Sequence, residues 1–259
     1  MITNEQITQM LHVIESIHSS TYYYVALVAL KATIIASAYY QLVKVLQSKK
    51  RSEMVGPFVG LASSLASYLI FQLIAPFGPM PAMDILKAIP WVLCQGYLAA
   101  CLDRLTTQRA NKGAWLMRIL LTSILTAIFI KPWAIPLTTT TIMVSIATLV
   151  GVASFTIPFP ALLQALYRIY YKQAPLRFSP QTTSLVLVSS ATPLLPFIGS
   201  MSTSIIAGLS MPQPLVAPLI QLFSTLLSTF ILPAWLICLA IIVTTLSRAI
   251  RQESGSQQT

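Results

Sequence analysis

Four side chains in the apolar segments of this sequence have the chemistry to bind a polar solute. They are one amine, one indole and two amides: Lys31, Trp91, Gln95 and Gln221. The amine could attract an anion, an amide both donates and accepts hydrogen bonds, and an indole stacks on a flat ligand. Each also has a structural interpretation. Lys31 could extend to the lipid headgroups, the amides could join helices, and Trp91 could belong to an interfacial aromatic belt.

Catalytic chemistry has little support in the sequence. All six acidic residues lie in loops or at the expected helix ends, and the two histidines, His12 and His18, precede the long apolar runs. The sequence contains no glycine-rich phosphate loop, no metal-ligand cluster and no Ser/His/Asp constellation. It therefore predicts no enzyme, no metal site and no cofactor. Without a carboxylate or histidine inside the expected spans, proton-coupled transport is also disfavoured.

The composition determines which elements position these side chains. Of the 259 residues, 56% are apolar and only 8% are charged, whereas soluble domains carry about 25% charged residues. Such a chain cannot cover a globular surface with polar side chains, so we expect an all-α integral membrane protein that crosses the lipid bilayer several times. The net charge of +10 does not indicate a nucleic-acid partner, because the basic residues form short clusters between apolar runs.

Seven apolar runs approach the length of about 20 residues that a membrane-spanning helix needs. They cover residues 22–46, 54–76, 85–102, 114–130, 137–158, 183–209 and 215–246. Pro233 interrupts the last run and predicts a kink there. Before the first run, apolar residues recur at helical spacing over residues 1–20, which predicts a short amphipathic helix at the membrane interface.

The distribution of charge predicts the orientation. Basic residues concentrate in the loops after the first, third and fifth runs and near the C-terminus, whereas the opposite side has only Lys87 and Lys131. By the positive-inside rule, the N-terminus lies outside and the C-terminus, with a tail over residues 248–259, is cytoplasmic. Arg118 lies close to the start of its run, so we expect its side chain to extend to the headgroups.

The chain also contains an internal repeat. One constant shift aligns three pairs of residues, Gln41 with Gln164, Lys49 with Lys172 and Pro57 with Pro180. Each trio covers a helix end, a basic loop and the start of the next helix. This pattern predicts two parallel three-helix units, 22–102 and 137–247, with residues 114–130 as a connecting helix.

The repeated segments resemble a known transporter family. The sequence AYYQLVKVLQSKKRSEMVGPF (38–58) resembles the first-repeat signature of the SWEET sugar transporters and the wider PQ-loop superfamily. The sequence IPFPALLQALYRIYYK (157–172), followed by Pro180, is similar to the second copy, and Gln95-Gly96 resembles the Asn-Gly of that family. The resemblance implies the 3+1+3 fold and hinge prolines at Pro57, Pro180 and either Pro158 or Pro160.

This chain departs from the family at two points. The first run has no proline, and the only asparagines are Asn4 and Asn111, outside the apolar runs. Gln95 and Gln221 could replace the family's sugar-binding asparagines. Alternating access also requires breaks or gates in the helices. The residues that could supply them are Tyr39 and Tyr40 as an inner gate and, as breaks in the fifth and sixth helices, Pro158, Pro160, Pro193 and Pro196.

These observations lead to a functional prediction and one alternative. The prediction is a facilitator that moves a small polar or anionic solute, such as a sugar or an organic acid, by rocking two three-helix units. The alternative is a non-transporting membrane scaffold subunit or cargo receptor, and the sequence leaves a homo-oligomer open. A cavity shared by Lys31, Gln95 and Gln221 would favour transport, whereas side chains that face lipid or are packed solid would favour the alternative.

The orientation can be tested by cysteine labelling in a background without the native cysteines. We expect Ser52→Cys and Thr107→Cys to react only with reagent delivered from the cytoplasm, because both positions lie in loops rich in basic residues. Gln213→Cys should react only from outside. Labelling of position 213 from the cytoplasm would contradict seven spans.

Overall fold

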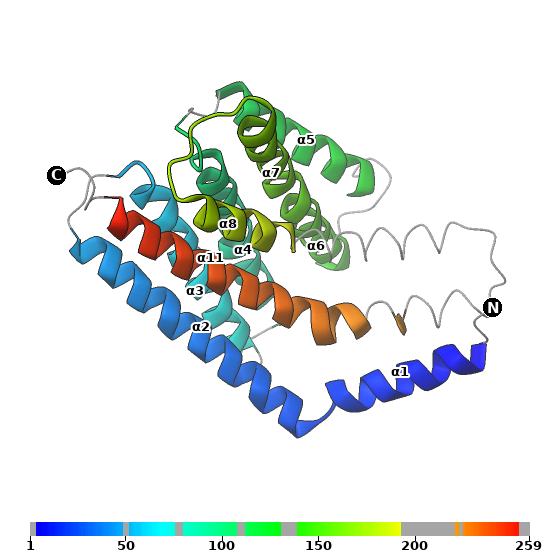
Figure 1. Ribbon diagram of the computed structural model, residues 1–259. Helices are drawn as coiled ribbons and strands as arrows, with labels where there is room; N and C mark the ends of the chain where they lie inside the picture. The colour runs from blue at the N-terminus through cyan, green and yellow to red at the C-terminus, as the bar shows by residue number, and fades with distance from the viewer. Residues whose placement is uncertain are drawn as a thin grey trace.

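The computed structural model describes residues 4–48, 52–75, 80–107, 112–130, 139–192, 221–222 and 225–253 (Figure 1). Within these ranges the chain is helical and contains no strand, apart from one isolated bridge between Thr106 and Leu176. Four helices there are long and apolar enough to cross a membrane: Thr21–Gln47, Val55–Ile74, Leu149–Tyr171 and Thr229–Gln252. The prediction of an all-α chain is confirmed, and these helices indicate a multi-pass membrane protein.

The described residues form α-helices and two short π-helices. In chain order they are α1 (Asn4–His18), α2 (Thr21–Gln47), α3 (Val55–Ile74), α4 (Met80–Asp103), α5 (Lys112–Ile130), α6 (Thr139–Thr156), α7 (Pro158–Leu166), the π-helix η2 (Tyr167–Tyr171), α8 (Pro180–Ala191), the π-helix η3 (Leu227–Ile231) and α11 (Leu232–Gln252).

Proline marks several helix boundaries. Pro158 opens α7 immediately after α6 ends at Thr156, although Ile157 between them keeps a helical backbone and donates to the Ala153 carbonyl. Pro180 opens α8, and Pro57 lies in the first turn of α3. Both positions suit proline, because the first turn of a helix has no use for its missing N–H group. Pro233 similarly lies at the start of α11, where η3 ends. Residues 248–252 continue that helix, so the first part of the predicted tail is helical.

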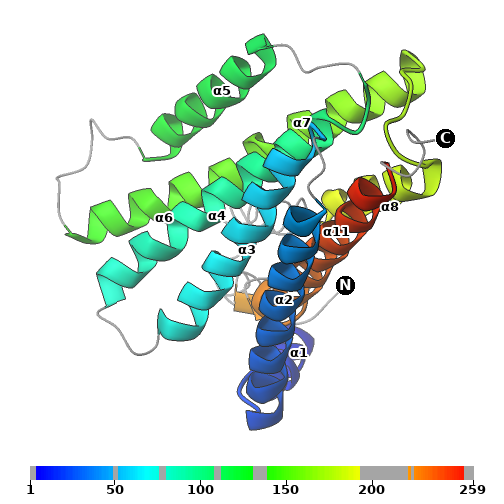
Figure 2. The ribbon, with the colours of Figure 1, turned by 90° about the vertical axis from the view of Figure 1, so that its left-hand side faces the viewer.

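The central helices pack side by side around one apolar core. α3 lies between α2 and α4, and α11 packs against both α2 and α8 (Figures 1 and 2). α4 continues the assembly by packing on α6 and α7, while α5 packs on α6 at the edge of the described bundle. The close approach of α3 to α4 depends on Gly60, because a Cβ atom there would lie 2.3 Å from the Tyr97 ring.

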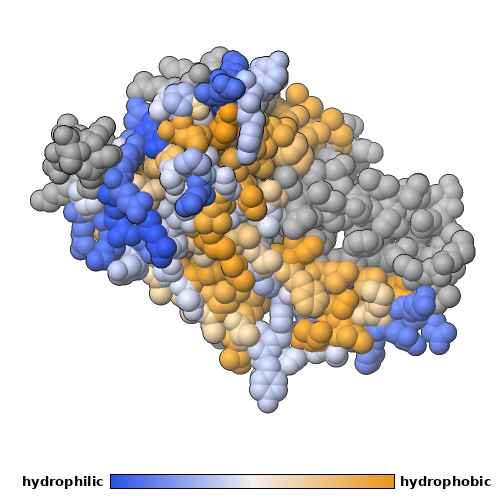
Figure 3. Space-filling model, viewed as in Figure 1, coloured by the Kyte–Doolittle hydropathy of each residue, from blue (hydrophilic) through white to orange (hydrophobic). Residues whose placement is uncertain are grey.

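The basic segments meet at one end of the bundle. The Arg177 guanidinium donates to Glu53 at 3.1 Å and forms an ion pair with Glu253 at 3.7 Å. The Arg177 backbone N–H donates to the Leu105 carbonyl, and the Ser52 hydroxyl donates to the Glu253 carboxylate. Hydrophilic side chains gather at this end, and apolar side chains dominate the middle of the same face (Figure 3).

The first helix packs against the opposite end. The side chains of Ile7, Leu11 and Ile14 are buried and form a small cluster with Leu222. His12 is exposed, while the Nδ1 atom of His18 lies 3.0 Å from the Thr229 hydroxyl. The predicted amphipathic helix is therefore present, and its apolar face is covered in part by the chain itself.

Arg118 forms a buried ion pair, so the prediction that it extends to the headgroups is wrong. Its guanidinium donates to both oxygens of Asp103, at 2.7 and 2.8 Å, and each side chain is only 2% exposed. The same guanidinium donates to Gln164 at 2.8 Å. Asp103 is the last residue of α4, which is why a partner for Arg118 is available at this depth. The ion pair joins α4, α5 and α7.

We expect removal of either partner of this ion pair to destabilise the protein by about 3–5 kcal/mol, because the other charge is left buried and unpaired. Thermal unfolding in detergent should therefore occur at lower temperature in Arg118→Met and in Asp103→Asn. The double variant Arg118→Met/Asp103→Leu should recover part of the loss. Lys44→Met removes a cation that lies over the Tyr40 ring and serves as the control. Single variants that unfold like this control would contradict the role of the pair.

Candidate functional site

Gln95 is the most unusual polar side chain in the described part of the bundle. It lies on α4 and is fully buried, and neither its amide nitrogen nor its amide oxygen has a hydrogen-bond partner there. A buried polar group without a partner costs roughly 1–3 kcal/mol. The core must therefore offset this cost, and a ligand hydroxyl or carboxylate could supply the missing bonds.

Aromatic rings lie one turn from this amide. The Trp91 ring, also on α4, is 4.4 Å from the Tyr68 ring and 4.1 Å from the Trp235 ring. Its indole N–H donates to the Ser154 hydroxyl at 2.6 Å. The cluster therefore connects α3, α4, α6 and α11, where helices from the two halves of the chain meet. The indole nitrogen of Trp235 is a second buried donor without a partner among the described residues.

Lys31 lies on another part of the bundle surface. Its side chain is partly buried on α2, and it is close enough to Lys87 of α4 for the two cations to repel each other. Lys87 precedes Gln95 by about 12 Å along α4. Lys87 therefore places a positive charge about two helical turns from the buried amide, and Lys31 lies within the range of that charge.

Gln221 is not brought to the buried face that carries Gln95. Its side chain is exposed, and its amide donates to the Glu15 carboxylate of α1 at 2.8 Å. The contact fastens the first helix to the segment before η3, which is one of the structural roles that an amide can have.

The expected gate residues are tyrosines on α2, and the expected hinge residues are prolines. Tyr39 and Tyr40 are exposed on α2, on a different side of the helix from the buried Ala38 and Gln41. Pro57, Pro158, Pro160 and Pro180 lie in the first turns of their helices, whereas Pro193 and Pro196 are outside the described residues. The role of these prolines as hinges stays a prediction.

Sequence reasoning missed Tyr68 and Trp235 as neighbours of Trp91. Both are single aromatic residues within long apolar runs, where an aromatic side chain is ordinary core or belt material. Only the packing of α3 and α11 against α4 reveals that the three rings form one cluster.

No protein-family model matches the sequence, and no curated protein or solved structure matches it significantly. The resemblance to the SWEET and PQ-loop proteins therefore stays a prediction from the motifs.

The unpartnered amide gives a prediction for stability. Gln95→Leu should raise the free energy of unfolding by about 1–3 kcal/mol, because leucine needs no hydrogen bonds in this buried position. Gln41→Leu is the matched control and should lower it, since the Gln41 oxygen accepts a bond of 2.8 Å from Ser247. Thermal unfolding of both variants in detergent measures the difference. A destabilised Gln95→Leu protein would mean that the amide has a structural partner.

Proposed function

We propose that this chain is a facilitative membrane transporter for a small polar solute, with Gln95 and the Trp91–Trp235 rings at its binding site. The observation that carries the proposal is the buried Gln95 amide, which has both a free donor and a free acceptor among the described residues. A solute with hydroxyl groups would supply both partners, and an aromatic ring beside it would pack on the solute's apolar face. The solute class that fits best is a sugar or another polyhydroxy compound.

The contacts between helices support two parallel three-helix units in this proposal. Within the chain halves, α3 packs on α2 and α4, and α8 packs on α7 and α11. Between the halves, α2 packs on α11 and α4 packs on α7. Exchanging α2 with α7, α3 with α8 and α4 with α11 leaves this set of contacts unchanged, as a two-fold relation between parallel repeats requires.

The proposal places the end with Arg177, Glu53 and Glu253 in the cytoplasm. The segments that meet there are the ones whose basic residues predicted a cytoplasmic location. Trp91 lies midway along α4 and Tyr68 in the second half of α3, whereas Trp235 lies near the start of α11, at the opposite end of that helix from Glu253. A solute site at such a position agrees with binding near the bilayer midplane.

A second candidate function is a scaffold subunit or cargo receptor. Two observations favour this function: Gln95 is fully enclosed, and Gln221 lies apart from it on Glu15. Among the described residues, the two amides therefore do not share the cavity that a pore lined by both would need. In that case the polar end of the bundle would bind a cytoplasmic partner.

Counterflow in proteoliposomes decides between the two functions. A panel of radiolabelled neutral sugars, polyols and organic acids should include at least one solute that the wild-type protein exchanges. For that solute, Gln95→Leu should reduce the rate by at least about tenfold, the loss expected from two hydrogen bonds of about 1 kcal/mol each. Gln221→Leu, the same change at an exposed position, should stay within twofold.

The panel also tests the role of Lys31. If the solute is an organic acid, Lys31→Met should reduce its exchange, because the cation beside Lys87 attracts anions. If the solute is neutral, Lys31→Met should leave exchange unchanged. Absence of exchange for the whole panel, or equal rates for Gln95→Leu and wild type, would favour the scaffold subunit.

A further inference from the structure

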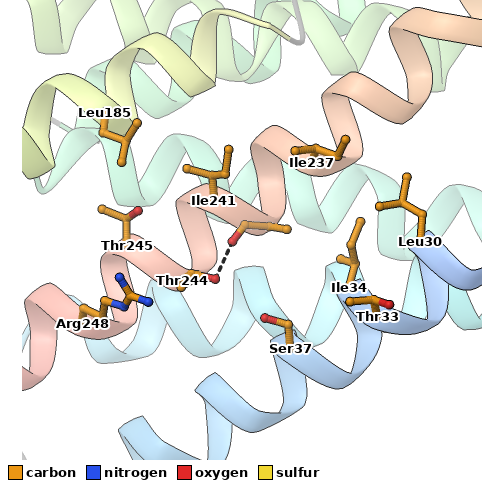
Figure 4. Close-up of a pocket in the computed structure, with 11 residues that line it drawn as sticks. Leu30, Thr33, Ile34, Ser37, Leu185, Ile237, Ile241, Thr244, Thr245 and Arg248 are labelled. Carbon is orange, nitrogen blue, oxygen red and sulfur yellow. Dashed lines mark hydrogen bonds between the residues drawn. The ribbon is translucent and has the colours of Figure 1, made fainter.

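A groove of about 450 Å³ runs along the outside of α11. α11 supplies its floor with Ile237, Ile241 and Thr244, while Ile34 of α2 and Leu185 of α8 contribute to its sides (Figure 4). The lining is mostly aliphatic, and its few polar groups are hydroxyls and one guanidinium. The Thr244 hydroxyl already donates to the Ala240 carbonyl of its own helix at 2.8 Å. Such a surface suits a hydrocarbon chain better than a sugar.

The groove lies where lipid would contact the protein. Leu185 and Ile237 are each 45% exposed. α2 is also the candidate spanning helix with the smallest buried share within the bundle, so most of its apolar surface faces outward. Since α2 and the helix that contains α11 are long enough to span a bilayer, acyl chains would fill this groove in the membrane.

A single cation closes one end of the groove. Arg248 is exposed, and it has no ion pair or hydrogen bond among the residues that the structure describes. Its guanidinium is turned back toward Thr244 and Thr245 (Figure 4). By contrast, Arg251 on the next turn already donates to Ser247 and to Gln41. Within the described part of the chain, Arg248 is therefore an unpaired guanidinium at the boundary between the apolar groove and the polar end of the bundle.

The dimensions of the groove match one leaflet. Ile237 and Arg248 are 11 residues apart on α11, which corresponds to about 16 Å along the helix axis. Half the hydrocarbon core of a bilayer is about 15 Å thick. An acyl chain that starts at the headgroup level of Arg248 would therefore reach Ile237 near the bilayer centre.

From these observations we propose that the groove between α2, α8 and α11 binds one anionic phospholipid of the cytoplasmic leaflet. Its phosphate would pair with Arg248 and the Thr245 hydroxyl, and one acyl chain would lie over Ile241 and Ile237 toward the bilayer centre. Arginine fits this role because its planar guanidinium donates two parallel hydrogen bonds to a phosphate. The proposal depends on the membrane position of the helices and not on transport by the protein.

Native mass spectrometry of the detergent-purified full chain tests this site. The probes are phosphatidylglycerol and phosphatidylcholine with identical palmitoyl and oleoyl chains. We expect the wild-type protein to retain one molecule of phosphatidylglycerol in preference to phosphatidylcholine. Arg248→Gln should weaken that retention by about fivefold, the effect of one basic residue on an anionic lipid. Lys44→Gln, which removes a cation outside the groove, should leave it unchanged.

A second variant tests the apolar part of the site. Ile241→Trp places a larger side chain over the floor of the groove and should reduce retention of both lipids. A photoreactive group at the end of the acyl chain should label α2 near Ile34 or α11 near Ile237. Equal retention of the two lipids by the wild-type protein, an Arg248→Gln variant that binds like wild type, or labelling of other helices would overturn the proposal. Transport is not measured in this experiment, so its result is separate from that of the counterflow assay.

Discussion

Lipid offers no hydrogen-bond partner, and this constraint governs the polar side chains of the bundle. A polar side chain between the helices must find its partner within the chain, reach the headgroups or bear the cost of having none. Arg118 takes the first course through Asp103 and Gln164, and in doing so fastens the edge helix α5 to the bundle. Gln41 does the same through Ser247 and joins α2 to α11. Among the described residues Gln95 takes neither of the first two courses, which is why it stands out as a candidate for ligand binding.

The class of protein could be predicted from the sequence, because a chain with so few charged residues cannot cover its surface in water and must lie largely in lipid. Some helix starts could be predicted as well, because proline suits the first turn of a helix, as at Pro158 in α7 and Pro180 in α8. The ion pair of Arg118 could not be predicted, because its partner Asp103 lies at the end of a different helix. Only the packing of the helices brings the two side chains together. The contact of Gln221 could not be predicted for the same reason, since its partner Glu15 belongs to the N-terminal helix.

The candidate site could be predicted in part. Trp91 and Gln95 lie one turn apart on one helix, so their proximity is a local property that the sequence contains. Trp235 and Tyr68 come from helices far apart in the chain, and no periodicity reports which ring meets which. The groove along α11 is still harder to foresee, because its floor and sides come from three helices.

Two kinds of polar group thus separate along the bundle, and each suits a different ligand. Gln95 is neutral, enclosed and unpartnered, so only a ligand that enters the protein can satisfy it, and a charge there would be expensive. Arg248 is charged and exposed beside an apolar groove, so it can meet an anion without leaving the headgroup region. α11 contributes Trp235 to the aromatic cluster and Ile241 to the floor of the groove. A phospholipid in the groove would therefore contact the same helix that carries Trp235. A ligand shifts an equilibrium between two conformations only if it binds them with different affinity. A lipid at Arg248 that bound one position of α11 more tightly than another would therefore change the packing of Trp235 against Trp91.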